Sequence, residues 1–333
     1  MVINSKRNSR HLRLKQTIYI VCEGTNTEPN YFNAIDQELD KSEKSYSIEV
    51  YPSKEDKDNA SKKEGESIKT DAVSLVQIAQ REREIENYDE VWVVFDKDGY
   101  TKHQDAFLYA KENDIKLAFS SIAFEHWILL HYEQNRTAFP KSQNVIDYLE
   151  QAGYFPGYKK ADIYIYARLK DLTKTAIENA AWLRMEMANH LAACDNKIYE
   201  LNLYTTVDEL VRKLLDFNPV TYGYITQTLR ISDYSITVND VQRDGGITLS
   251  VSIVNHGKGG YLVNNHCNHF YLKDEKQKEF PLVNDTTIKI EPSSTQDIAL
   301  EFEISSATGQ LRLHFSPKQK EILIIALDNI TEP

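Results

Sequence analysis

From residue 17 to about residue 133 the sequence alternates short β-branched runs with longer amphipathic stretches, and this alternation limits the fold more than any other feature. It is typical of βα units around a parallel sheet. The expected strands are 17–22, 46–51, 90–95 and 116–119, and the expected helices are 28–39, 66–86, 102–112 and 124–132. The first and third strands are almost continuously apolar, so we expect both of their faces to be buried.

Two further regions follow, so the 333 residues are expected to form more than one folding unit. Residues 136–228 have a helical pattern, with expected helices at 144–151, 162–169, 172–193 and 206–215. Later residues alternate β-branched positions with turn clusters, at about seven short strands in about 100 residues, which is the density of an immunoglobulin-like sandwich. The predicted organisation is a basic N-terminal arm (1–16), a parallel-sheet α/β domain with helices on both faces (17–135), a helical extension (136–228) and an all-β sandwich (232–330). The charged segment 53–64 is expected to be an exposed loop.

The charge distribution limits the classes of partner. A net charge of −11 argues against a protein that coats nucleic acid over its whole surface, because affinity for phosphate backbones grows with the number of cations presented. The first acidic residue is Glu23, so the arm is cationic and either follows a phosphate backbone or is a solvated tail. The sequence has no apolar run of membrane-spanning length, no secretory signal and no disulfide-like cysteine pattern. These features predict a cytoplasmic protein with no membrane partner.

Acidic motifs follow two of the apolar strands. Glu23-Gly24 comes directly after the first strand, and Asp96-Lys97-Asp98-Gly99 ends the third. Open α/β sheets bind ligands at the carboxyl ends of their strands. Asp96 and Asp98 should project to the same side, where both could bind one hard cation, whereas Lys97 should point away. If the two strands are neighbours, Glu23 joins the pair, and the repulsion among three carboxylates favours a bound metal. A surface turn is the alternative for the DxD motif taken alone.

The pairing of these two motifs resembles the Toprim signature. Three blocks resemble, in order and spacing, the RloB-like family of the Toprim superfamily, which occurs in prokaryotic abortive-infection and defence loci: IVCEGTNTEPNYF (20–32), VWVVFDKDG (91–99) and SSIAFEHWILLH (120–131). The resemblance covers about residues 10–217 and leaves out the β-rich region. It implies that Asp96 and Asp98 bind Mg²⁺, for which Mn²⁺ could substitute, and that the domain makes or breaks phosphodiester bonds.

The resemblance also suggests roles for residues around the two aspartates. Glu23 would bridge the ions or accept a proton from the attacking water. Glu125 begins the helix after the fourth strand, at the same sheet edge, and is a candidate metal ligand; the alternative is an acid favoured there by the helix dipole. Lys160 takes the place where the family often has a lysine, and would offset charge on the phosphate, although Lys159 and Lys160 could equally be solvated. We expect His131 to be a buried core histidine.

The expected function is a Mg²⁺-dependent nuclease that acts as a defence effector on RNA or DNA, with tRNA or another RNA favoured. The first alternative is a non-catalytic sensor or adaptor of a defence system that holds a nucleotide or metal. The second is a nucleotidyl transferase, which the small chain without a zinc module disfavours. No Walker A, GxGxxG or GxSxG motif is present. The β-sandwich is expected to serve recognition or oligomerisation, which leaves a defence-system partner protein and a homo-oligomer open.

Overall fold

The computed structural model describes residues 16–41, 46–62, 71–97, 102–263, 269–283, 288–304, 309–317 and 321–327. The chain divides into two compact units, which are treated separately. The first unit comprises Met1–Leu129, Thr137–Thr173 and Lys197–Leu215, and the second comprises Leu130–Arg136, Lys174–Asn196 and Asp216–Pro333. The predicted basic arm, except for Gln16, lies outside the described residues.

A five-stranded sheet forms the centre of the first unit, in the order β2-β1-β3-β4-β5. Its strands are β1 (Gln16–Cys22), β2 (Tyr46–Tyr51), β3 (Glu90–Asp96), β4 (Lys116–Ser121) and β5 (Tyr204–Thr205). The first four run parallel, and β5 is antiparallel to β4. The predicted strands and the mixed α/β class are therefore confirmed.

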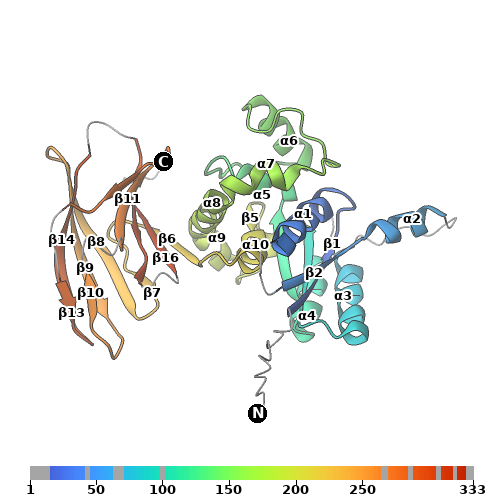
Figure 1. Cartoon of the computed structure of the whole chain (residues 1–333), viewed down its shortest axis with the longest axis horizontal. Coiled ribbons are helices and arrows are strands. Elements are labelled where there is room, and N and C mark those ends of the chain that lie inside the picture. The colour runs from blue at the N-terminus through green and yellow to red at the C-terminus, as the bar shows by residue number, and fades with distance from the viewer. Residues whose placement is uncertain are drawn as a thin grey trace, which may run out of the picture. The chain divides into compact units, whose positions relative to one another are not determined.

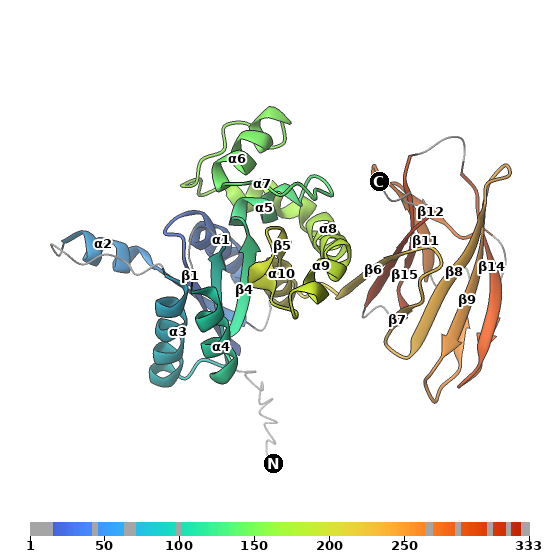
Figure 2. The same cartoon turned by 180° about the vertical axis from the view of Figure 1, so that it is seen from behind.

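Helices cover both faces of this sheet (Figures 1 and 2). On one face α3 (Ala72–Glu86) and α4 (His103–Glu112) pack against apolar side chains of β1, β3 and β4. The other face carries α1 (Thr27–Lys41) and α10 (Val207–Leu215). The remaining helical elements between β4 and β5 are α5 (Phe124–Leu129), α6 (Ser142–Gln151), α7 (Ile165–Leu169), η1 (Lys170–Leu172), α8 (Thr173–Glu186), α9 (Ala188–Ala193) and η2 (Ile198–Glu200). Each predicted helix thus has a counterpart, although the predicted helix 172–193 is interrupted at Met187 between α8 and α9, and residues 66–70 of the predicted helix 66–86 lie outside the described residues.

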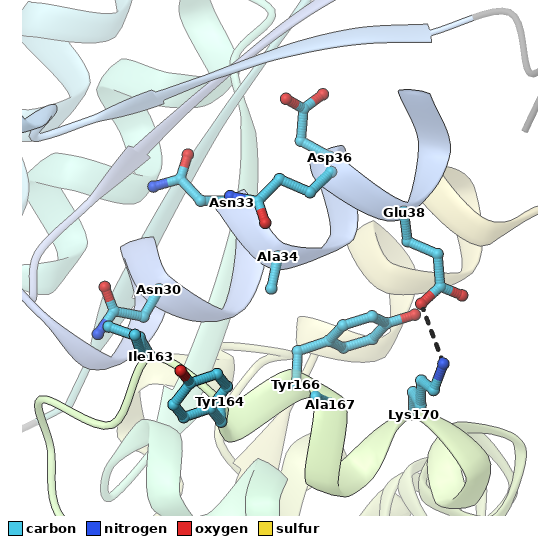
Figure 3. A pocket seen from close by; sticks show the side chains of 11 residues that line it. Asn30, Asn33, Ala34, Asp36, Glu38, Ile163, Tyr164, Tyr166, Ala167 and Lys170 are labelled. Carbon is cyan, nitrogen blue, oxygen red and sulfur yellow. Dashed lines mark ion pairs between the residues drawn. The ribbon is translucent and has the colours of Figure 1, made fainter. Parts of the chain in front are cut away.

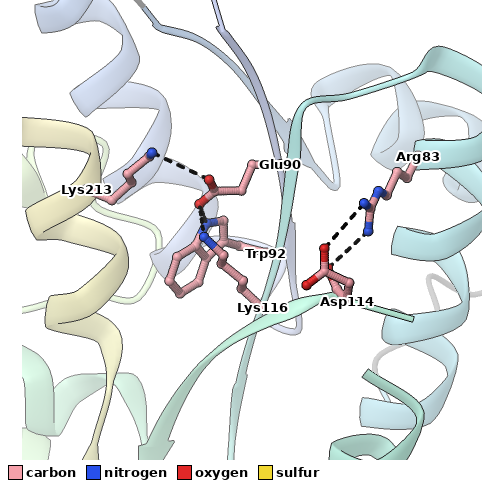
Figure 4. A network of polar contacts seen from close by, with 6 residues as sticks. All are labelled: Arg83, Glu90, Trp92, Asp114, Lys116 and Lys213. Carbon is pink, nitrogen blue, oxygen red and sulfur yellow. Dashed lines mark hydrogen bonds and ion pairs between the residues drawn. The ribbon is translucent and has the colours of Figure 1, made fainter. Parts of the chain in front are cut away.

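Glu90 joins the amino ends of β3 and β4 to α10 (Figure 4). Its Oε1 accepts a hydrogen bond from Trp92 Nε1 at 2.6 Å and lies 2.9 Å from Lys116 Nζ, while Oε2 lies 3.5 Å from Lys213 Nζ. Partial burial alone would raise the pKa of Glu90, but the hydrogen bonds from Lys116 and Trp92 outweigh it and hold the pKa below its usual value. This network fixes the end of the sheet opposite the predicted site.

The segment 53–64 was expected to be an exposed loop. This prediction was wrong, since Lys54–Lys62 form helix α2. Composition was misleading here, since a local cap starts the helix. The Asp56 N–H donates to Ser53 Oγ at 3.1 Å, and Asp56 Oδ2 accepts from the Ser53 N–H at 2.8 Å. This reciprocal pair satisfies backbone donors that the first helical turn leaves unpaired.

The second unit contains the β-rich region as two main sheets. One has the order β12-β11-β15-β16-β6, the other β14-β9-β8-β7, and β10 pairs with β13. Most pairings are antiparallel, and β16 with β6 is parallel. The strands are β6 (Val220–Tyr224), β7 (Leu229–Ile231), β8 (Tyr234–Gln242), β9 (Ile247–Asn255), β10 (Tyr261–Val263), β11 (Phe270–Asp274), β12 (Glu279–Pro281), β13 (Ile288–Ile290), β14 (Thr295–Phe302), β15 (Leu311–Phe315) and β16 (Ile322–Ala326).

One apolar core joins the two main sheets, as expected of a sandwich. Val238 and Val251 from one sheet and Leu272 and Leu313 from the other belong to the same buried cluster. Residues 136–228 were expected to be helical, but they also contain the strands β5 and β6, so this prediction was incomplete. No helix in the part of the chain that the structure describes is long and apolar enough to cross a membrane.

Candidate functional site

The two strands that carry the acidic motifs are direct neighbours. Cys22 of β1 lies opposite Val94 of β3 in the parallel register. The Glu23 N–H donates to the Val94 carbonyl oxygen at 2.9 Å, and Glu23 Oε2 accepts from the Asp96 N–H at 2.7 Å. The parallel pairing of the two strands therefore brings these two acids together at the carboxyl edge of the sheet, although they are far apart in sequence.

Four acidic side chains line one cavity of about 220 Å³ at this edge, and they are Glu23, Glu28, Asp96 and Glu125. Glu28 comes from the first turn of α1, and Glu125 from the first turn of α5, which follows β4. Both of these residues are buried. Each acid thus comes from a different element, and each element begins or ends at the same sheet edge.

Crowding and burial perturb these acids strongly. Burial, opposed by a backbone hydrogen bond and reinforced by the carboxylates of Glu125 and Glu23, raises the pKa of Glu28 to about 7. Burial and the carboxylates of Glu28, Glu23 and Glu125 also raise the pKa of Asp96 well above its usual value, although a backbone hydrogen bond from Phe124 opposes them. The Asp96 Oδ1 atom is buried and has no hydrogen-bond partner. A buried polar atom without a partner is costly, so its persistence requires an explanation.

Lys160 and Tyr158 approach the cavity from the loop before α7. The Lys160 Nζ atom lies 3.6 Å from Glu125 Oε1, and the Tyr158 hydroxyl donates to the same oxygen at 2.9 Å. Thr27 Oγ1 donates to the Lys160 carbonyl at 2.9 Å and so ties this loop to the start of α1. The positive charge at the cavity rim is thus directed at Glu125.

The structure brings together Glu23, Asp96, Glu125 and Lys160 of the residues predicted for the site. Asp98 lies outside the described residues. Lys97 points away from the acids as expected, since its Nζ donates to the carbonyl oxygens of Glu200 and Leu201 at 2.8 and 3.0 Å. His131 is fully buried, as expected for a core histidine.

Sequence reasoning did not include Glu28, Tyr158 or Gly24 in the site. Glu28 was available as a signal, since it is the second acid of the EGTNTE run, but an acid in a first helical turn has an ordinary explanation in the helix dipole. Gly24 matters because a Cβ there would lie 2.6 Å from Glu28 Oε1. A side chain at position 24 would therefore displace the Glu28 carboxylate from its present place.

The donor set can be compared with the needs of a cation. Carboxylate oxygens are the ligands that Mg²⁺ and Mn²⁺ prefer. Within the described ranges, which omit Asp98, no group of three or more His, Cys, Asp and Glu side chains is arranged as a formed metal site. The chemistry of the acids and the orphaned Asp96 Oδ1 nevertheless fit a hard divalent cation.

Comparison with known proteins gives a family for most of the first unit. No curated protein matches the chain. Similar solved structures include the yjhA protein from Bacillus subtilis, with 16% identity, a TM-score of 0.28, and coverage of 32% of this chain and 100% of that one. CapF with the inhibitor 3-isopropenyl-tropolone has 10% identity, a TM-score of 0.19, and coverage of 92% and 99%. Neither similarity is close enough to inform the fold or the function.

The family comparison agrees with the resemblance found in the sequence blocks. The model of the RloB-like protein family matches residues 18–214, which is more than half of the chain and includes every acid of the cavity. The β-rich region falls outside this match, as it falls outside the resemblance of the blocks. The chain therefore belongs to the RloB-like protein family.

Proposed function

We propose that this protein is a metal-dependent nuclease that hydrolyses phosphodiester bonds. The observation that carries the proposal is the buried Asp96 Oδ1, which has no partner at a point where four acids meet. Carboxylates crowded into one cavity repel one another, and a divalent cation relieves that repulsion. The cavity of about 220 Å³ also leaves room for a phosphate group beside an ion, since a water molecule takes about 30 Å³.

Asp96 and Asp98 would hold Mg²⁺ or Mn²⁺, with Glu28 and Glu125 as further oxygen donors. When bound, the ion supplies Lewis acidity toward a phosphate oxygen and lowers the pKa of water. Glu23 already accepts a hydrogen bond from the Asp96 backbone, so one of its oxygens fixes the loop after β3. Its carboxylate remains the candidate for accepting a proton from the attacking water.

Lys160 would stabilise negative charge on the phosphate. Its side chain is 57% exposed, so the ammonium group can move from Glu125 toward an incoming substrate. Tyr158 would keep Glu125 in place during that movement, because its hydroxyl donates to the same carboxylate oxygen. A covalent protein intermediate is not required by this arrangement.

The proposed substrate is nucleic acid, with RNA such as tRNA favoured over DNA, and the proposed setting is antiviral defence in the cytoplasm. The cationic arm would add affinity for the phosphate backbone. The β-rich region would serve recognition, binding of a defence partner or formation of a homo-oligomer.

The test is cleavage by the full chain of end-labelled tRNA, single-stranded DNA and plasmid, with Mg²⁺, with Mn²⁺ or with EDTA. Cleavage is expected only with a divalent ion, and it should be lost in Asp96→Ala and in Asp98→Ala. Asp105→Ala is the matched control, since this exposed aspartate lies in the first turn of α4. Thermal shift with Mn²⁺ gives a readout independent of turnover, and Asp96→Ala should abolish the shift.

Three outcomes decide between this proposal and the alternative. Metal-dependent cleavage lost with either aspartate supports the nuclease. A Mn²⁺ shift without cleavage of any of the three substrates would instead favour a sensor or adaptor that holds a metal without turnover. If Asp96→Ala and the wild-type chain cleaved equally, the acidic cavity would not be the active site.

A further inference from the structure

A second and larger cavity lies beside the acidic one. It has a volume of about 730 Å³ and lies between α1 and the segment that contains α7 (Figure 3). Asn30, Asn33 and Ala34 line it from α1, and Tyr164 and Tyr166 line it from the opposite side. We refer to this cavity as the α1–α7 groove.

The groove and the acidic cavity are built from the same two segments. Glu28 lines the acidic cavity and Asn30 the groove, two positions further along α1. Lys160 lines the acidic cavity and Ile163 the groove, three positions further along the chain. The hydrogen bond from Thr27 Oγ1 to the Lys160 carbonyl holds the two segments together at this point. A polymer cleaved at the acids would therefore continue into the groove.

The α1 side of the groove presents a row of carboxamides. Asn30, Asn33 and Gln37 occupy positions i, i+3 and i+7, which lie on one face of a helix. A carboxamide carries both hydrogen-bond donors and an acceptor, as the edges of nucleobases do. Asn33 and Gln37 are exposed and so accessible to a ligand.

The opposite side offers apolar and aromatic surface. Tyr164 and Ile163 are 66% and 62% exposed, which places them among the exposed large hydrophobic residues of the described chain. An exposed ring beside a groove is a stacking platform for an unpaired base, since every base has a π-face. In a duplex the bases already stack on one another, so they are not available to stack on such a ring.

The charges of the groove do not favour the phosphate backbone. Among its lining residues, all of which the structure describes, Lys170 is the single cation, and its Nζ lies 3.6 Å from Glu38 Oε2. Asp36 adds a second acid. Phosphates would be repelled here, so the polar and aromatic lining suits neutral groups with donors and acceptors.

We propose that the α1–α7 groove binds the bases of an unpaired nucleic-acid strand, of which one phosphate enters the acidic cavity. This inference rests on the proposed nuclease function and specifies its substrate as single-stranded or locally unpaired. Tyr164 stacks on a base, and the carboxamides of α1 contact base edges. RNA and DNA share this chemistry, and separate arms of the experiment distinguish them.

The test is binding by the full chain in EDTA, where no strand is cut, measured by fluorescence anisotropy. The probes are a labelled single-stranded RNA, a single-stranded DNA of the same sequence, the corresponding blunt duplexes and a strand with abasic sites. Single strands should bind more tightly than duplexes, and the abasic strand should bind weakly. Tyr164→Ala should weaken single-strand binding about 5- to 100-fold, and Tyr164→Trp should restore it. Leu108→Ala is the control, since this α4 residue is 51% exposed and lies outside the groove.

Equal affinity in wild type and Tyr164→Ala, a preference for duplex, or undiminished binding of the abasic strand would overturn the proposal, as would no binding at all. Failure of the nuclease proposal gives a different result. Tyr164-dependent strand binding without cleavage in Mg²⁺ would leave the groove assignment intact and remove the nuclease function. Cleavage of duplex alone would support the nuclease function and overturn the groove assignment.

Discussion

Gly24→Ala tests whether Glu28 belongs to a metal site. A Cβ at position 24 would lie 2.5 Å from Glu28 Cδ, whereas carbon atoms make favourable contact at about 3.5–4 Å. The Glu28 carboxylate must therefore move by about 1 Å. Metal–ligand distances tolerate about 0.2 Å, and a misplacement of about 1 Å at a reacting centre can cost about 100-fold. We expect divalent-metal affinity to fall about 10- to 100-fold.

Folding should be almost unaffected by this substitution. The clash is with the end of a flexible side chain, and Gly24 is not among the residues with positive φ, so alanine is not strained there. The free energy of unfolding without metal should change by less than about 1 kcal/mol. Mn²⁺ binding by calorimetry and thermal unfolding of the full chain measure the two effects separately. Gly259→Ala is the matched control, because no atom lies within 4 Å of a Cβ at that position.

A double-mutant cycle with Glu28→Ala tests whether Gly24→Ala lowers metal affinity through the Glu28 carboxylate. If Gly24→Ala acts by displacing the Glu28 carboxylate, it should reduce metal affinity hardly at all in the Glu28→Ala background, where that carboxylate is absent. An equal loss of metal affinity in the wild-type and Glu28→Ala chains would mean that Gly24→Ala acts through the loop backbone instead. Wild-type metal affinity in Gly24→Ala would refute the assignment of Glu28 to the site.

Three further predictions concern single polar groups. Asp96→Asn should raise Tm without divalent ions and abolish the Mn²⁺ thermal shift, because it replaces a carboxyl group whose charged form burial and three neighbouring acids disfavour. Glu90→Gln should lower the free energy of unfolding by about 1 kcal/mol at pH 7. Because the pKa of Glu90 is lowered in the fold, denaturant unfolding should show that this difference between variant and wild type disappears as pH falls below about 4. Burial lowers the pKa of His314, aided by Lys273, Lys174 and Arg312, so the unfolded chain takes up a proton that the folded chain does not. Unfolding free energy should thus decrease below about pH 6.5, by up to about 1.4 kcal/mol per pH unit, and His314→Gln should remove that slope; a slope unchanged in the variant would assign it to other groups.

The edge of the sheet could be predicted from sequence because parallel strands end together. Apolar runs followed by Glu23 and by Asp96 indicate strand ends, and βα alternation predicts a parallel sheet. Adjacency of the two strands was a condition of that argument, and the register of Cys22 with Val94 satisfies it. The periodic pattern also predicted the helices between β4 and β5, where apolar spacing is regular.

What sequence reasoning missed depends on contacts rather than on pattern. Helix α2 has a charged composition typical of a loop, and only the side-chain bonds between Ser53 and Asp56 reveal its start. Strand β6 is short and gains its partner β16 from about a hundred residues later in the chain. The hydrogen bond from Tyr158 to Glu125 joins residues far apart in sequence, and no local pattern predicts it. The pairing of β6 and the contact of Tyr158 follow from tertiary contacts, which override local propensity, whereas the start of α2 follows from a local cap.

The distribution of partners within the acidic cavity distinguishes a structural cluster from a binding one. A cluster that served folding alone would direct its donors at the most deeply perturbed acid. Here Tyr158 and Lys160 both contact Glu125, while Asp96 Oδ1 has no partner. The fold thus satisfies the buried carboxylate of Glu125, whereas at Asp96, whose carboxylate has a backbone hydrogen bond from Phe124, the Oδ1 atom is left without a partner. Such an atom is costly unless a cation completes the site. For this reason the gain in metal-free stability expected for Asp96→Asn and its loss of Mn²⁺ response should occur together, and a variant that showed only one of them would separate the orphaned oxygen from metal binding.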